Sequence, residues 1–270
     1  MNKNSILIPV DFSEASSSAI KLAANLAKID DLSLTLLHIT SGNNEQEVMN
    51  ELKSTIDQIA LNGHPKVEYK VRKGKLIDEI SSEACEDCYR YMIIGSHGFK
   101  GIREKIMGTD ILKLLKTLPV PVICIQKGYE LPETGIKKIL FPASEHEAFS
   151  QKIQATLLMA VSFKAEVFIY TVQKPGTELS GNLRGNIRMA KAEFATANIP
   201  FTEVTEPQEN FSIGYSKQIM AFASKNGMEM ISLMLNPTQE NYYFADSDKE
   251  RILTNDLKIP VLCTNDKYPA

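Results

Sequence analysis

The feature that most constrains the fold of this chain is an internal repeat of short apolar runs. KKILFPAS (137–144) aligns with NSILIPVD (4–11), and EVFIYTV (166–172) aligns with SLTLLHI (33–39) at the same spacing. Near the end of the chain, IPVLC echoes the VPVIC of residues 120–124. Three matches in the same order exceed what generic apolar strands share by chance. The chain is therefore predicted to hold two copies of one structural unit.

Within the first copy, short apolar runs alternate with segments of helical periodicity. The expected strands are 4–11, 32–39, 67–71, 91–95 and 120–125. Between them, apolar residues such as Leu22 and Leu26 recur at the spacing of one helical face. Strands that alternate with helices imply crossover connections and a parallel sheet. The fold class is therefore expected to be α/β, with helices on both faces of the sheet.

Length and charge favour two ordinary globular domains. A chain of 270 residues suits two domains, and glycine and proline place the linker near 128–135, which gives domains at 1–128 and 135–270. A net charge of −3 without a basic tail argues against nucleic-acid binding. No run of about 18 apolar residues exists to span a membrane. Four cysteines are too few for a disulfide framework, so the expected location is the cytoplasm.

The segment GSHGFKGIREKIMGT (95–109) concentrates four of the 14 glycines of the chain. It joins an expected strand to the next helix, and parallel sheets bind ligands at such strand ends. Gly95 and Gly98 would turn the chain with exposed amides. Gly108 and Thr109 would open a helix whose free N–H groups suit an anion. The alternative to a binding site is a pair of ordinary turns.

Asp11 adds weight to the interpretation of this segment as a nucleotide site. It follows the first strand, which in a doubly wound sheet neighbours the fourth. Its carboxylate could accept hydrogen bonds from a ribose or a base. It could also cap the helix that begins near Ser13, and the two roles are compatible.

The run ILIPVDFSE (6–14), together with Gly95-x2-Gly98-x9-Gly108-Thr109, resembles the universal stress protein family. The resemblance covers the first copy along its whole length. It implies Rossmann-like domains of the adenine nucleotide alpha hydrolase type, each with a five-stranded parallel sheet of order 3-2-1-4-5. It also implies a stress-response or signalling module that binds ATP or a related adenine nucleotide.

The same resemblance assigns the nucleotide contacts to particular positions of this chain. The base and ribose would lie against strand ends, and the ribose and phosphates against the glycine segment and the helix start. These residues are Pro9, Val10, Asp11, Ile39, Ile94, Gly95, Gly98, Gly108, Thr109 and Asp110. Asp110 departs from the small or apolar residue common in the family. Its carboxylate would compete with phosphate unless it helps to hold Mg²⁺, so Mg²⁺ stays open as a second cofactor.

The second copy lacks the features that carry the resemblance. Ser144 stands at the position of Asp11, and Asn236 stands where Gly95 would be. No glycine follows the strand at 230–235 before residue 252. A degenerate domain, retained for packing and partner contact, is favoured over a domain with a different ligand. One nucleotide per chain, in the first domain, is predicted.

The predicted function is a nucleotide-dependent signalling module and not an efficient enzyme. No nucleophile–base pair and no G-x4-G-K-[ST] phosphate loop is present. A slow Mg²⁺-dependent ATP hydrolase or nucleotidyl transferase is one alternative, and a scaffold that binds no nucleotide is another. In the family, single domains commonly dimerise through their last strands. Here that contact would be internal, a pseudo-dimer with Val122 near Val261, while a homodimer and unknown protein partners stay open.

Overall fold

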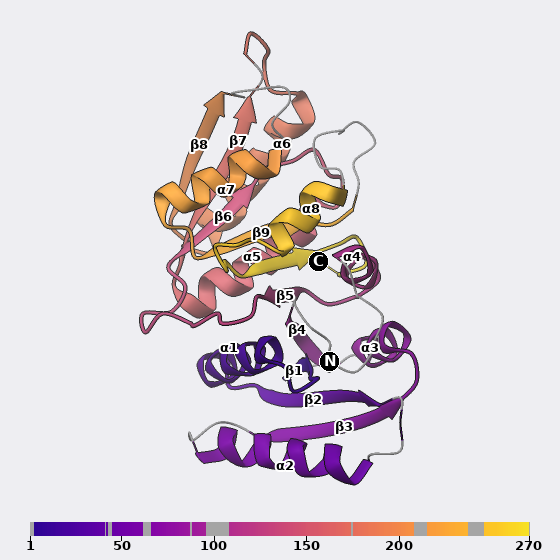
Figure 1. Cartoon of the computed structure of the whole chain (residues 1–270). Coiled ribbons are helices and arrows are strands. Elements are labelled where there is room, and N and C mark those ends of the chain that lie inside the picture. The colour runs from indigo at the N-terminus through magenta and orange to yellow at the C-terminus, as the bar shows by residue number, and fades with distance from the viewer. Residues whose placement is uncertain are drawn as a thin grey trace.

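The computed structural model describes residues 3–40, 42, 45–61, 66–86, 88–95, 108–173, 175–207, 215–236 and 246–269. For residues 61 and 108–110 it describes the backbone alone. A single ten-stranded sheet runs through both halves of the chain, in the order β3-β2-β1-β4-β5-β10-β9-β6-β7-β8. Figure 1 shows the first half below and the second half above, with the sheet continuous between them.

The first half alternates strands and helices as its periodicity predicts. Its strands are β1 (Ser5–Pro9), β2 (Ser33–Thr40), β3 (Val67–Lys73), β4 (Tyr89–Gly95) and β5 (Val122–Ile125). Its helices are α1 (Glu14–Asp30), α2 (Glu45–Leu61), α3 (Leu76–Ala84) and α4 (Gly108–Leu115). All neighbouring strands within this half pair in parallel. The strand order is therefore 3-2-1-4-5, the order that the resemblance implies.

The second half repeats this plan. Its strands are β6 (Lys138–Pro142), β7 (Glu166–Gln173), β8 (Phe201–Pro207), β9 (Met230–Met234) and β10 (Val261–Thr264). Its helices are α5 (Phe149–Phe163), α6 (Gly181–Thr196), α7 (Tyr215–Asn226) and α8 (Asp246–Leu253). Its strand order, numbered within this half, is also 3-2-1-4-5 when read inward from β8. Both halves therefore have the α/β class and strand order expected from the sequence.

The two halves meet where β5 and β10 pair in antiparallel fashion. Leu262 lies opposite Ile123, Val261 opposite Cys124 and Cys263 opposite Val122. Val122 and Val261 are therefore not directly opposite each other, and the centre of the junction is one residue further along each strand. The antiparallel pair joins two parallel halves into one sheet, because a twofold relation between the halves reverses the strand direction.

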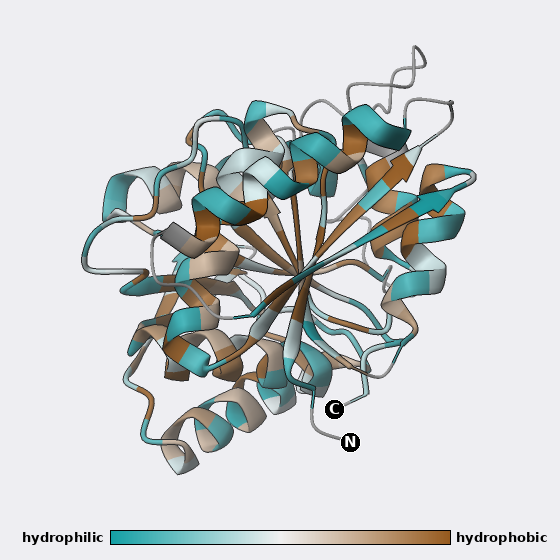
Figure 2. Cartoon of the chain, turned by 90° about the horizontal axis from the view of Figure 1, so that it is seen from below, coloured by the Kyte–Doolittle hydropathy of each residue, from teal (hydrophilic) through white to brown (hydrophobic). Residues whose placement is uncertain are grey.

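Helices cover both faces of the sheet and divide the core into two layers. The cluster on one face takes residues from α1, α2, α5 and α6, and the other takes residues from α3, α4, α7 and α8. Figure 2 shows hydrophobic residues concentrated in the strands and on the helix faces directed toward them. Within the described ranges, no helix is long and apolar enough to cross a membrane.

Candidate functional site

The candidate site lies where the strand order of the first half reverses. β1 sits between β2 and β4, so the crossovers that leave β1 and β4 pass to opposite faces of the sheet. The carboxyl ends of these two strands therefore frame a crevice, the usual ligand position in open α/β sheets. Asp11 follows β1, and Gly95 ends β4. The fold thus brings two sequence-distant parts of the predicted set to one edge.

Asp11 and Ser13 stabilise the start of α1 through two different hydrogen bonds. The Ser13 side chain is the N-cap of α1, and its Oγ accepts a hydrogen bond from Ser16 N at 3.2 Å. Asp11 Oδ1 accepts a hydrogen bond from Ser13 N at 3.0 Å. The helix cap is therefore Ser13, and Asp11 supports the turn before it. Its carboxyl group is only half-buried, which keeps it within reach of a ligand at the strand ends.

An aromatic pair, which sequence reasoning left out of the site, holds the turn that carries Asp11. Phe12 has a φ of 60°, the left-handed region that non-glycine residues rarely adopt. Its ring stacks on His38 with 5.0 Å between centroids. His38 Nδ1 lies 2.9 Å from Val10 O, and because a carbonyl only accepts, Nδ1 carries the proton. The histidine and the phenylalanine together fix the backbone on both sides of Asp11.

Gly95 is required by packing. A Cβ at this position would lie 2.8 Å from the carbonyl carbon and from the Cβ of Ala15, in the first turn of α1. Gly95 is not among the glycines with positive φ, and the turn predicted after it lies outside the described residues. The close approach of α1 to the end of β4 therefore depends on glycine at this position.

Helix α4 begins at Gly108, as the glycine pattern predicts. Its first N–H groups have no partner within the helix, and its dipole is positive at this end. The side chains of Thr109 and Asp110, and the whole of Gly98, lie outside the described residues. The assigned roles of these three residues therefore stay predictions.

The apolar members of the predicted set lie at the strand ends with different exposure. Pro9, Val10 and Ile94 are buried, and Ile94 is covered completely. Ile39, near the end of β2, is half-buried and packs against the second core cluster. Ile39 is therefore the member of this group with the most surface to offer a base.

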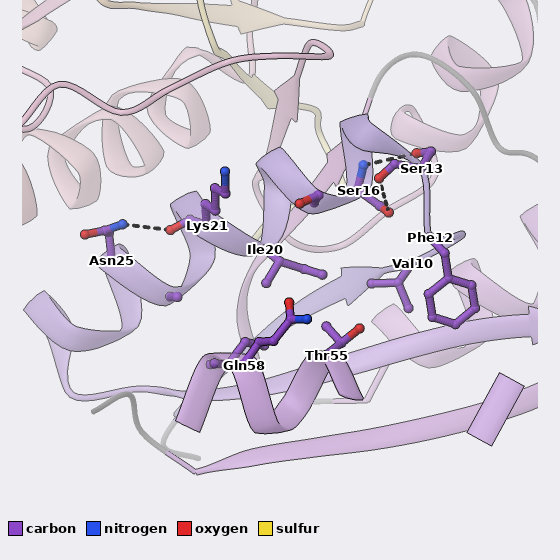
Figure 3. Close-up of a pocket in the computed structure, with 12 residues that line it drawn as sticks. Val10, Phe12, Ser13, Ser16, Ile20, Lys21, Asn25, Thr55 and Gln58 are labelled. Carbon is purple, nitrogen blue, oxygen red and sulfur yellow. Dashed lines mark hydrogen bonds between the residues drawn. The ribbon is translucent and has the colours of Figure 1, made fainter. Parts of the chain in front are cut away.

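A groove of about 440 Å³ opens between α1 and α2, beside the turn at Phe12. Figure 3 shows Val10, Phe12 and Ser13 at one end of it and Asn25 at the other. Its lining mixes hydroxyl, amide and aliphatic groups, and comprises Val10, Phe12, Ser13, Ser16, Ser17, Ile20, Lys21, Ala24, Asn25, Thr55, Gln58 and Ile59. Of the predicted nucleotide residues whose side chains the structure describes, only Val10 lines it, so the groove is largely separate from the described part of the predicted strand-end site.

The matching edge of the second half holds two lysines that sequence reasoning missed. Lys152 and Lys249 are both buried, and their ammonium groups donate to backbone carbonyls at the ends of β6 and β9. Two acidic residues, Asp246 and Asp248, lie beside Lys249 in the first turn of α8. In the structure Asp246 pairs with Lys116, and Asp248 accepts a hydrogen bond from Ser216. A lysine within an otherwise apolar helical stripe was the available signal.

Comparisons with known proteins place the first half in one family. The family described as "Universal stress protein family" matches residues 3–126. Universal stress protein YxiE of Bacillus subtilis (strain 168) is 25% identical over 146 residues, which cover 46% of this chain and 99% of that protein.

Solved structures extend the likeness of fold to both halves. A universal stress protein from Archaeoglobus fulgidus DSM 4304 superposes with a TM-score of 0.75 at 15% identity, covering 98% of this chain and 100% of that one. A protein of unknown function from Pseudomonas aeruginosa PAO1 superposes with a TM-score of 0.65 at 17% identity, covering 97% and 93% of the two chains. At these identities the likeness concerns the fold. The family match spans the whole of the first α/β unit, so residues 3–126 of this chain are similar to the universal stress protein family.

Proposed function

We propose that the first half binds one adenine nucleotide, ATP or a close relative, at the carboxyl ends of β1 and β4, and that the chain acts as a nucleotide-dependent stress-response module in the cytoplasm. The observation that carries the proposal is that Asp11, just after β1, and Gly95, at the end of β4, lie at one strand-order reversal. Neither feature alone is specific for a nucleotide.

The groups present at this edge suit the parts of a nucleotide. The half-buried carboxylate of Asp11 is an acceptor for ribose or amino hydrogens, as an acidic residue is in dinucleotide folds. The amino-terminal end of α4 offers N–H donors and a favourable dipole for phosphate. Ile39 supplies apolar surface at the end of the neighbouring strand.

We further propose that residues 1–128 and 135–270 are tandem domains of the family, the second without the nucleotide site of the first. The support is the repeated strand order and the segment between them, in which Gly128 and Gly135 both have positive φ. In the described parts of the chain no three His, Cys, Asp or Glu side chains gather as a metal site. The proposal names a nucleotide and a binding role, and Mg²⁺ stays open as a second cofactor.

Calorimetric titration with ATP tests the nucleotide site through two variants. Asp11→Ala should weaken ATP binding about ten- to hundredfold, because a charge-assisted hydrogen bond is lost. Gly108→Val should abolish binding without unfolding the chain, because a branched side chain would occupy the phosphate position at the start of α4. ATP affinity unchanged in both folded variants would refute the site.

A variant that fills the α1–α2 groove is the matched control for these two variants. Thr55→Trp adds an indole from α2 to the α1–α2 groove and should leave ATP affinity unchanged. If Thr55→Trp abolishes binding while Asp11→Ala does not, the nucleotide occupies the groove. Turnover of added ATP by the pure protein separates the binding module from a slow hydrolase, and absence of any nucleotide binding would favour a scaffold.

A further inference from the structure

The second half buries two ammonium groups at the carboxyl edge of its sheet. Lys152, on α5, is 1% exposed and Lys249, on α8, is fully covered. Lys152 donates to Pro142 O at the end of β6 and lies over the ring of Phe141. Lys249 Nζ lies 2.6 Å from Leu235 O, just past the end of β9. Because α5 and α8 cover opposite faces, the two ammonium groups reach this edge from both sides of the sheet.

Among the described residues, neither of these two charges has a close carboxylate of its own. Among the described residues no carboxylate lies within ion-pair distance of Lys152. The nearest carboxylate to Lys249 is Asp246, at 3.8 Å. Asp246 is itself engaged by Lys116, with Nζ–Oδ1 and Nζ–Oδ2 distances of 2.8 and 2.9 Å. Burying an ammonium group without a counter-charge is costly, so the arrangement calls for an anion.

Two hydroxyl groups at the same edge also lack partners. Ser144 follows β6 and Thr171 lies near the end of β7, on strands linked by the 2.8 Å hydrogen bond from Ala143 N to Tyr170 O. Their buried oxygens, Ser144 Oγ and Thr171 Oγ1, have no hydrogen-bond partner in the described part of the chain. Asn186 holds the adjoining turn in place, because its Nδ2 donates to Ser144 O at 2.8 Å and to His146 O at 3.1 Å.

A buried imidazole, His146, accompanies the two lysines. It is buried, and its pKa is lowered to about 3, chiefly by burial and further by the charges of Lys152 and Lys249. The imidazole is therefore neutral at physiological pH and adds no charge. Burial also lowers the pKa of Lys152 to about 7 and, with the charge of Lys116, that of Lys249 to about 8. A bound anion would hold both lysines in their charged form.

We propose that this edge of the second half is a binding site for one tetrahedral oxyanion, a phosphate group, contacted by Lys152 and Lys249 with Ser144 and Thr171 as hydroxyl donors. Several convergent donors suit the oxygens of phosphate better than the two oxygens of a carboxylate. The site lies at the strand-order reversal of its own half, between β7 and β9 on either side of β6. It is independent of the nucleotide site proposed for the first half.

The direct test is calorimetric titration of the full chain with inorganic phosphate, in a buffer free of phosphate and sulfate, at about pH 6.5. One saturable site per chain is expected. Lys152→Met and Lys249→Met should each weaken phosphate binding about tenfold or more. Lys217→Met removes an exposed lysine from α7 and should leave the affinity unchanged. No saturable binding up to about 10 mM phosphate, a concentration that would reveal even weak sites, would overturn the proposal.

Sulfate supplies the pH test, because it remains a dianion throughout the range. Its affinity should fall about tenfold or more between about pH 6 and pH 9, as Lys152 and Lys249 lose their protons. His146 stays neutral over this range, and Asp246 stays paired with Lys116, so the lysines dominate the change. Sulfate affinity that is the same at both pH values would contradict the assignment.

A further variant and a competition experiment distinguish a variant that fails to fold from a proposal that is wrong. If a lysine variant fails to fold, Thr171→Val in its place should weaken phosphate binding. Wild-type stabilisation by sulfate should also rise with the logarithm of sulfate concentration above its Kd, as mass action requires. Saturating ATP should leave phosphate binding intact, since the two sites are distinct. Full displacement of phosphate by ATP would place the anion in the first half and refute the proposal. Tighter binding of phosphorylated metabolites than of free phosphate would identify the group as part of a larger ligand.

Discussion

Gln126 and Asn265 make equivalent buried hydrogen bonds across the junction, each from its own half to the other half. Gln126 Nε2 donates to Leu253 O, the last carbonyl of α8, at 2.7 Å. Asn265 Nδ2 donates to Leu115 O, the last carbonyl of α4, at 2.7 Å. Each residue directly follows the last strand of its own half and satisfies the helix end of the other. The halves therefore depend on each other for groups that would otherwise be unpaired.

Asn265→Leu should lower the free energy of unfolding by about 1–3 kcal/mol, because the carbonyls of Leu115 and Leu118 both lose their donor. Gln126→Leu should cost less, since its own Oε1 already lacks a partner among the described residues. Urea unfolding of both variants measures the difference. Equal stability of wild type and Asn265→Leu would show that this hydrogen bond contributes nothing to the junction.

Val122→Asp should separate the two halves. Val122 is 1% exposed at the β5–β10 junction, so the new carboxylate would be buried without a partner. Limited proteolysis should then cleave near residues 128–135 faster than in the wild type. Val161→Asp is the control, because Val161 is 57% exposed on α5. A Val122→Asp protein as compact and as protease-resistant as Val161→Asp would mean that the halves are held together elsewhere.

Gly95→Ala should destabilise the first half by about 1–3 kcal/mol, because the added Cβ would overlap the backbone of Ala15 and displace α1. Gly181→Ala is the matched control. A Cβ at Gly181 meets nothing within 4 Å, and alanine favours the helix that begins there. Thermal unfolding of the two variants gives the comparison, and no loss for Gly95→Ala would mean that α1 is loosely packed on β4.

The buried lysines should make the protein more stable as the pH rises from about 7 to about 9.5. The pKa of Lys152 is lowered to about 7 and that of Lys249 to about 8, whereas both titrate near 10.4 in an unfolded chain. Between these values the unfolded state binds more protons than the folded state. Each lysine then adds up to about 1.4 kcal/mol of unfolding free energy per pH unit.

Urea unfolding in phosphate- and sulfate-free buffer checks this pH dependence. Lys152→Met should flatten the rise, because one of the two titrating groups is gone. A flat profile for the wild type between about pH 7 and pH 9.5 would show that the lysines keep their ordinary pKa values.

The strand–helix alternation and the repeat were predictable because buried parallel strands are short apolar runs with distinct ends. β8 was not predicted, because it lacks such an apolar run. Its residues, Phe201–Pro207, are mostly exposed or half-buried at the edge of the sheet, so FTEVTEP has no apolar run. The residue pairing between β5 and β10 was also not predictable, because the apolar residues of the two strands do not distinguish one register from another. In the structure Val122 pairs with Cys263.

The candidate site was predictable only in part. The positions of Asp11 and Gly108 follow from strand ends and helix starts, which the pattern indicates. The need for glycine at position 95 was not predictable, because it depends on the close approach of Ala15, which belongs to a distant segment of the chain. Lys152 and Lys249 were missed because a lysine in a helix is normally an exposed residue, and burial depends on the tertiary fold.

The central claim, one adenine nucleotide per chain in the first half, is tested most directly by native mass spectrometry of the full chain with saturating ATP. The account predicts a mass increase of a single nucleotide for the wild type and no increase for Gly108→Val. Two nucleotides bound to the wild type, or one still bound to a folded Gly108→Val chain, would contradict it.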